Sequence, residues 1–109
     1  KRISEIKNLK SFAFCALGNP ENFFSQLRSE KFHLIGAKTF RDHHFYTQKD
    51  IDELEKESKK KGVEILLTTA KDAVKLKDLQ FDFPCFVVQT EVFFDNQKSF
   101  RALILSENI

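Results

Sequence analysis

Short apolar runs alternate with amphipathic stretches along this chain, and the alternation predicts strands and helices in turn. The run 11–17 (SFAFCAL) is apolar almost throughout, which is typical of a strand buried on both faces of a parallel sheet. Branched and aromatic side chains indicate further strands at 32–40, at 63–67 and from 86 to about 94. The last apolar segment, 99–105, is expected to form a terminal helix, with a strand as the alternative. The side chains that face inward in such a helix are Phe100, Leu103 and Ile104.

Capping residues mark where the predicted helices begin and end. Asn19 followed by Pro20 suits the start of a helix after the first strand, because Asn caps well and Pro fits the first turn. Thr47 and Asp50 are spaced as a capping pair for a second helix, which is expected to stop at Gly62. The apolar residues that recur at helical spacing, and so face inward, are Phe23, Phe24, Leu27, Ile51 and Leu54.

A third, short helix over 73–76 completes the order strand–helix–strand–helix–strand–helix–strand, which predicts an α/β fold. Right-handed crossovers then give a three-layer sandwich, in which helices flank a small, mostly parallel, four-stranded sheet. A chain of 109 residues suits a single domain, 1–109, and its 13 Phe with no Trp indicate an aromatic core. The sequence holds no Met, so we expect Lys1 to follow residues that belong to the same protein.

Composition narrows the classes of partner. The 18 basic and 16 acidic residues nearly balance, at a formal charge of +2, so a nucleic-acid partner is not expected. No apolar stretch approaches the ~20 residues that cross a bilayer, and no signal peptide is present. Cys15 and Cys85 lie far apart inside apolar runs, which predicts two buried free thiols in a reducing compartment.

Polar segments follow three of the predicted strands directly: 18–20 (GNP), 42–44 (DHH) and 68–72 (TTAKD). Because the carboxyl ends of parallel strands share one edge of a sheet, we expect these segments to meet on one rim, where open α/β sheets bind ligands. Helices also begin there, and their free backbone N–H groups suit an anion.

The Asp42-His43 pair is the strongest candidate for acid–base chemistry, since a carboxylate beside an imidazole can orient the ring or raise its basicity. A polar loop without function is the alternative. His43 and His44 are adjacent, but neighbouring side chains diverge and no third ligand is evident, so no metal site is expected. His33, inside a strand, is expected to be structural.

Hydroxyl groups and one ammonium group in the third polar segment suit a phosphate or another anion. The residues concerned are Thr68, Thr69, Lys71 and Asp72. Helix capping and a solvated surface explain the same residues without function. Gly18 and Asn19 face the same choice between ligand binding and capping.

No GxxxxGK[ST] phosphate loop, GxGxxG turn or GxSxG elbow occurs in the chain. Nor does a Ser or Cys stand in a recognisable nucleophile setting. A rim of acid–base and cationic groups without a phosphate cradle indicates half of an active site.

Three motifs in sequence carry a resemblance to a known family: 14–24 (FCALGNPENFF), 40–47 (FRDHHFYT) and 66–76 (LLTTAKDAVKL). In this order and spacing they closely resemble the C-terminal lobe of the tetraacyldisaccharide 4'-kinases, the lipid A kinases of Gram-negative bacteria. The resemblance covers 11–88. It implies transfer of the ATP γ-phosphate, with Mg²⁺, to the 4'-hydroxyl of a lipid A disaccharide 1-phosphate precursor. The phosphate loop and the magnesium-binding carboxylates of such kinases lie in an N-terminal lobe, which this sequence does not contain.

The resemblance also assigns site residues. The family's Asp-His pair falls on Asp42 and His43, and it implies that His43 is catalytic, as partner to an N-terminal-lobe carboxylate that activates the acceptor hydroxyl. Tyr46 belongs to the same motif. The family's Thr-Thr-Glu-Lys-Asp stretch falls on Thr68, Thr69, Lys71 and Asp72, with Ala70 in place of the usual Glu.

Family membership would place the whole enzyme in the cytoplasm, at the inner face of the inner membrane, with membrane contact only through the rest of the protein. The lobe alone is then expected to be inactive, because phosphoryl transfer needs the phosphate loop and the metal. Two alternatives stay open: a stand-alone, non-enzymatic module that binds a phospho-ligand or a protein on the same rim, and a folding unit whose polar rim residues are only caps.

Overall fold

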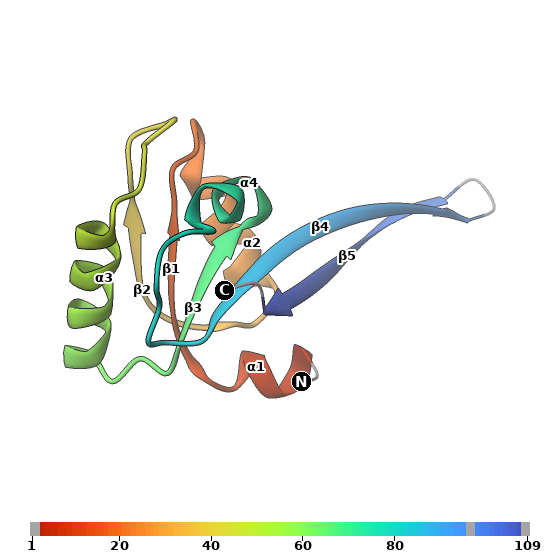
Figure 1. The fold of residues 1–109 in the computed structure, drawn as a ribbon. Coiled ribbons are helices and arrows are strands. Elements are labelled where there is room, and N and C mark those ends of the chain that lie inside the picture. The colour runs from red at the N-terminus through yellow and green to blue at the C-terminus, as the bar shows by residue number, and fades with distance from the viewer. Residues whose placement is uncertain (1–2, 96–97, 108–109) are drawn as a thin grey trace.

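Five strands form one sheet of order β2-β1-β3-β4-β5 (Figure 1). The structure is a computed structural model that describes residues 3–95 and 98–107, with side chains described for 5–89. Neighbouring strands among β2, β1, β3 and β4 pair in parallel, and β5 pairs antiparallel to β4. The strands are β1 (Lys10–Cys15), β2 (His33–Thr39), β3 (Ile65–Thr69), β4 (Cys85–Asp95) and β5 (Lys98–Glu107).

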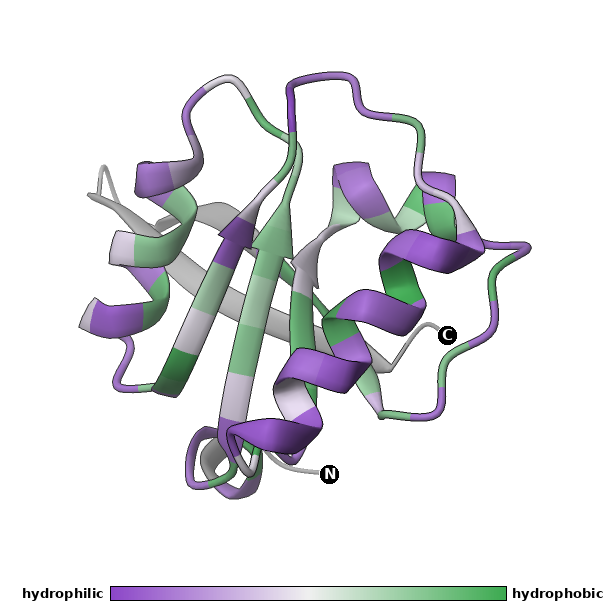
Figure 2. Cartoon of the chain, turned by 90° about the vertical axis from the view of Figure 1, so that its left-hand side faces the viewer, coloured by the Kyte–Doolittle hydropathy of each residue, from purple (hydrophilic) through white to green (hydrophobic). Residues whose placement is uncertain are grey.

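Helices cover both faces of the parallel part of the sheet, which confirms the predicted α/β class and its layers. Short α1 and longer α2 contribute to the core on one face, and α3 with the 3-10 turn η1 to the core on the other. Figure 2 shows the polar sides of the helices turned outward and apolar residues concentrated along the central strands. The helices are α1 (Ile3–Lys7), α2 (Pro20–Ser29), α3 (Gln48–Lys60), α4 (Ala70–Ala73) and η1 (Val74–Leu76).

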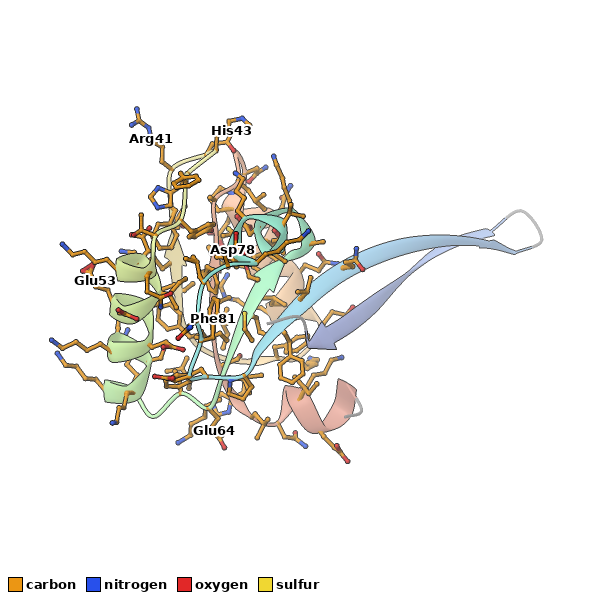
Figure 3. All side chains as sticks on the ribbon, viewed as in Figure 1. Arg41, His43, Glu53, Glu64, Asp78 and Phe81 are labelled. Atoms are coloured by element: carbon orange, nitrogen blue, oxygen red, sulfur yellow. The ribbon has the colours of Figure 1, made fainter. Side chains whose placement is uncertain are left out.

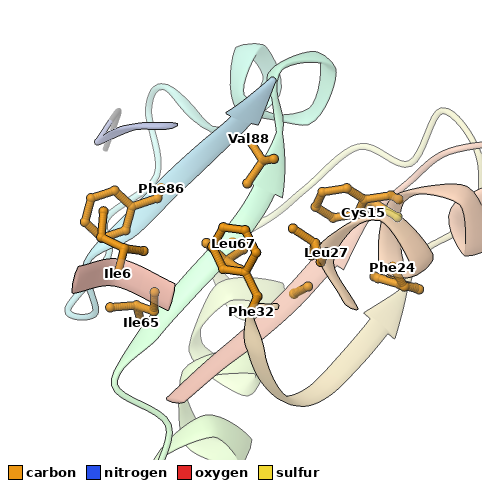
Figure 4. Close-up of a cluster of buried hydrophobic side chains, with 11 residues drawn as sticks. Ile6, Cys15, Phe24, Leu27, Phe32, Ile65, Leu67, Phe86 and Val88 are labelled. Atoms are coloured by element: carbon orange, nitrogen blue, oxygen red, sulfur yellow. The ribbon is translucent and has the colours of Figure 1, made fainter. Parts of the chain in front are cut away.

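Alternation along β1 divides the interior into two cores. Phe12 and Phe14 point toward α3, whereas Ala13 and Cys15 point toward α2, and all four side chains are buried. Figure 4 shows the core on the α2 face, in which Leu27 of α2 lies among side chains from the strands. A strand buried on both faces is what an unbroken apolar run predicts. Each fully buried Phe stabilises the fold by about 1.5–3 kcal/mol.

Local signals account for both ends of α3. The Thr47 hydroxyl accepts a hydrogen bond from the Asp50 N–H, and the Asp50 carboxylate accepts one from the Thr47 N–H, so the predicted cap of α3 is confirmed. Gly62 has φ +75° just after the end of α3, as a helix stop requires. Asn19 stands at the N-cap of α2, but its side chain makes no capping hydrogen bond, so that part of the prediction is wrong.

The predicted terminal helix over 99–105 is wrong, because this segment lies in β5. β4 pairs with β3 only as far as Val88, and its other edge would leave a row of unpaired N–H and C=O groups. β5 satisfies that edge over the whole span from Phe86 to Asp95. Pairing in the tertiary structure therefore overrides the helical spacing of the apolar residues. The inward packing expected of Phe100, Leu103 and Ile104 lies outside the described side chains.

Two features were not predicted. α1 precedes the first strand, and its Ile6 is buried in the core on the α2 face. β4 and β5 leave the body of the molecule together as a long two-stranded arm (Figure 1). Among the described helices, none has the length and apolar character needed to cross a membrane.

Candidate active site

The carboxyl ends of β1, β2 and β3 bring three polar segments together on one rim, which we define as residues 16–19, 40–47 and 69–72. The first two segments touch, because a Cβ built on Gly18 would lie 3.3 Å from Oδ2 of Asp42. Figure 3 shows Arg41 and His43 at this end of the molecule, with Glu64 at the opposite end. Asp72 of the third segment accepts hydrogen bonds from Ala16 and Tyr46 of the other two, so the predicted convergence of the three segments is confirmed.

The buried carboxylate of Asp72 joins the three segments of the rim. Its Oδ1 accepts hydrogen bonds from the Ala16 N–H and the Tyr46 hydroxyl, each at 3.0 Å, and its Oδ2 accepts one from the Thr69 hydroxyl. The Asp72 N–H returns a hydrogen bond to Thr69 at 3.1 Å, so Thr69 caps α4 as predicted. Because Asp72 is 1% exposed, these bonds take the place of water around its charge.

Burial makes the groups around Asp72 harder to ionise. Loss of solvent, and then the negative charge of Asp72, raise the pKa of the Tyr46 phenol, whose hydroxyl donates to Asp72. The same two causes raise the pKa of the Cys15 thiol to about 11. Cys15 and Cys85 are both buried and free, in different cores, as the sequence predicts.

Several residues of the predicted ligand set lie beneath the rim surface. Tyr46 and Thr68 are buried, and the Thr68 hydroxyl donates to the Phe14 carbonyl at 2.9 Å. With Asp72 they use their polar atoms inside the protein, where they support the rim. That these buried groups contact a ligand stays a prediction.

The exposed part of the rim presents Asp42, His43 and Lys71. The side chains of Asp42 and His43 are 43% and 77% exposed, and 3.7 Å separates Asp42 Oδ2 from His43 Nε2. At that distance the carboxylate can attract a protonated imidazole, but the contact is too long for a hydrogen bond. Lys71 is exposed, and it makes no ion pair within the part of the chain that the structure describes. These groups are free to meet a ligand.

His43 sits in a backbone conformation that glycine prefers, with φ +64°. It is the third residue of a tight turn that the His44 N–H closes by donating to the Arg41 carbonyl at 2.9 Å. A left-handed residue other than Gly is strained, and such strain gathers at functional sites. The turn lifts the imidazole away from the body of the protein (Figure 3).

We expect His43→Gly to be more stable than His43→Ala by about 1 kcal/mol, because Gly adopts a positive φ without steric cost. Urea unfolding of both variants measures the difference. The matched control is Lys56, exposed in the middle of α3, where the order reverses and Ala is more stable than Gly by about 1 kcal/mol. Equal stability of the two His43 variants would show that the turn does not hold this conformation in solution.

Two grooves open beside the rim. Asn19 and Thr69 line one of about 920 Å³, together with residues of α2. Arg41 and His44 line the other, of about 710 Å³, between β2 and α3. Asn19 and Thr69, predicted separately from two motifs, thus border one hollow. Gly18, between Leu17 and Asn19 of this lining, does not itself line the groove and lies against Asp42.

No role of His44 beyond a rejected metal site was predicted, yet the structure ties His44 closely to α3. Its Nε2 lies 2.8 Å from Oδ2 of Asp50, and its ring stacks on Phe40 at 4.8 Å between centroids. Burial opposes ionisation of Asp50, but hydrogen bonds from His44 and Thr47 outweigh it and lower the pKa of that carboxyl. The signal available in the sequence was the capping pair itself, Thr47 and Asp50, which stand three and six residues after His44.

Metal ligands are not gathered on the rim: the described residues include no group of three His, Cys, Asp or Glu side chains that could hold an ion. His33 lies at the exposed start of the edge strand β2, at the far end from the rim. His43 and His44 diverge, one toward Asp42 and the other toward Asp50.

The sequence of this chain matches a known protein family. The model of the family tetraacyldisaccharide-1-P 4'-kinase matches residues 1–108. A tetraacyldisaccharide 4'-kinase from Desulfotalea psychrophila is 43% identical over 77 residues, which are 71% of this chain. Proteins of the same name from Rickettsia canadensis and Gluconobacter oxydans are each 39% identical, over 83% and 94% of this chain. No solved structure matches.

The chain spans only part of these relatives. The matched regions are 22% of the Desulfotalea protein, 27% of the Rickettsia protein and 31% of the Gluconobacter protein. The rim described above therefore corresponds to a minor part of each relative.

Proposed function

This chain belongs to the tetraacyldisaccharide-1-P 4'-kinase family, and on that premise we propose that it forms the C-terminal lobe of a longer kinase. The complete protein transfers the ATP γ-phosphate to the 4'-hydroxyl of a lipid A disaccharide 1-phosphate precursor. It works in the cytoplasm at the inner face of the inner membrane, and the rest of the protein makes the membrane contact. The relatives leave more than two thirds of their length for that part.

The observation that carries this proposal is the exposed Asp42-His43 pair, presented on a strained turn above a buried network. The buried network orders the rim, while its acid–base groups face solvent. Such an arrangement suits an active site that the rest of the protein completes. His43 accepts the proton of the acceptor hydroxyl or orients the group that does, and Asp42 attracts the imidazolium that forms. Lys71 offers its charge to a phosphate.

ATP and Mg²⁺ are assigned mainly to the rest of the protein. The described residues offer neither a phosphate loop nor a cluster of three metal-ligating side chains. The metal would supply charge neutralisation on the phosphates during transfer. What this chain supplies is a positioned imidazole, a carboxylate and an ammonium group on one rim.

The test is phosphate transfer by the full-length protein. Purified enzyme, the tetraacyldisaccharide 1-phosphate and ATP labelled at the γ-phosphate are incubated with Mg²⁺, and the lipid product is analysed for the position of the label. We expect label on the 4'-oxygen. A correctly folded protein that leaves the lipid unlabelled, or labels another position, would remove the proposal.

Lys71 gives a second, independent prediction. Loss of one charge-assisted contact to a phosphate lowers kcat/KM for the Lys71→Ala enzyme by about tenfold or more. Lys77→Ala, which removes another exposed Lys outside the rim, is expected to leave kcat/KM unchanged. Equal behaviour of the two variants would mean that Lys71 is only a solvated side chain.

The rival function is a stand-alone binding module, favoured by the exposure of Lys71, two residues after Thr69, which borders a groove together with Asn19. This reading predicts that residues 1–109 alone bind a phosphate-bearing ligand, such as pyrophosphate, and that Lys71→Ala abolishes the binding. Calorimetry on the wild-type and substituted chains decides between the two functions. Tight binding by the isolated chain, with an inactive full-length protein, would favour the module.

A further inference from the structure

A chain of contacts runs from the N-terminus of α3 to the turn that carries His43. The Asp50 carboxylate accepts from the Thr47 N–H at 2.9 Å, and the same oxygen lies 2.8 Å from Nε2 of His44. The His44 N–H then closes the turn on the Arg41 carbonyl at 2.9 Å. One residue therefore holds the turn by its backbone and ties it to a helix by its side chain.

Aromatic packing fixes the orientation of the His44 ring. The ring stacks on Phe40 with 22° between planes, and Tyr46 meets it edge-on at 89° and 5.2 Å. The Tyr46 hydroxyl in turn donates a hydrogen bond to the buried Asp72 carboxylate. The side chains of His44 and Asp50 are only 29% and 21% exposed, so water competes weakly for their contact.

We propose that His44 is a positioning residue: through Asp50 and the ring of Phe40 it holds the Arg41–His44 turn so that His43 keeps its left-handed backbone and its place on the rim. The left-handed state of a non-Gly residue persists only when surrounding contacts impose it. Among the described side chains, His43 forms no hydrogen bond, and its 3.7 Å approach to Asp42 is too long to impose that state. The contacts that impose this backbone conformation are those of the next residue, His44, with Asp50, Phe40 and Arg41.

The proposal rests on the proposed kinase function, and its test uses the full-length enzyme. His44→Phe keeps a ring to stack on Phe40 but loses the contact with Asp50, and His44→Gln keeps a donor that can reach that carboxylate. We expect kcat to fall about tenfold for His44→Phe, with KM for ATP and lipid nearly unchanged, and to recover in part for His44→Gln. His33→Phe, on the distant edge of β2, is the matched control and keeps the wild-type kcat.

A double substitution shows whether His44 acts through His43. In a His43→Asn background, adding His44→Phe is expected to cause no further loss of kcat, because the positioned group is already gone. A full additional tenfold loss would mean that His44 acts independently of His43, and would overturn the proposal.

Limited proteolysis measures how firmly the Arg41–His44 turn is held, independently of catalysis. Trypsin cleavage after the exposed Arg41 should become about tenfold faster in His44→Phe, while cleavage after Lys77 keeps its rate. Unchanged cleavage after Arg41, or an active enzyme whose kcat does not respond to His44→Phe, overturns the positioning role alone. A folded wild-type protein without kinase activity overturns the proposed function instead, and the proteolysis result then shows separately whether His44 anchors the turn.

Discussion

Replacing His43 by Asn in the full-length protein is expected to lower the rate of phosphate transfer by about 10²- to 10⁴-fold, the range that a general acid–base group contributes. The side chain is 77% exposed, so its removal takes away little packing. Asn tolerates a positive φ better than most residues, so the turn should survive the substitution. Initial rates at saturating ATP and lipid measure the effect.

Stability separates a catalytic role of His43 from a structural one. The free energy of unfolding of His43→Asn should stay within about 0.5 kcal/mol of the wild-type value, as for other exposed positions. His33→Asn, at another exposed His, is the control and should change neither rate nor stability. A loss of stability with unchanged kcat per folded molecule would favour the reading in which the rim is only a folding unit.

Asp72→Ala is expected to lower the free energy of unfolding by roughly 3 kcal/mol or more. Three donors lose their acceptor, and each buried donor left unpaired costs about 1–3 kcal/mol. Against a total stability of about 5–15 kcal/mol, such a loss is large. Urea unfolding of the purified protein measures it.

Two further variants calibrate that result. Tyr46→Phe removes one of the three donors and should cost less than Asp72→Ala, about 1–3 kcal/mol. Asp78→Ala removes an exposed carboxylate next to η1 and should change stability by no more than about 0.5 kcal/mol. If Asp72→Ala proved as harmless as Asp78→Ala, the carboxylate would not be the element that joins the three segments.

The parts of the fold that could be predicted are those set by local chemistry. Thr47 with Asp50, and Gly62, fix both ends of α3 because capping and a left-handed stop depend on residues close in sequence. The unbroken apolar run of β1 predicts burial on both faces, because consecutive side chains of a strand point to opposite faces of the sheet. From these elements the parallel edge, and hence the rim, follows by topology alone.

The parts that could not be predicted depend on partners distant in sequence. The segment 99–105 has helical spacing, but the free edge of β4 determines that it pairs as a strand. Asp72 reads as a cap of its own short helix, and nothing near it shows that Ala16 and Tyr46 also donate to it. Likewise, the sequence suggests that Thr68 is an exposed ligand group, whereas its hydroxyl is buried and donates to the Phe14 carbonyl.

The measurement that tests the central claim most directly compares the full-length protein with residues 1–109 in one assay of phosphate transfer from ATP to the tetraacyldisaccharide 1-phosphate. The fragment is used once it shows cooperative unfolding, so that its rim is formed. The account predicts steady turnover by the full-length protein and none by the fragment, because the rim supplies only its own part of the site. Metal-dependent turnover by the pure fragment would contradict it.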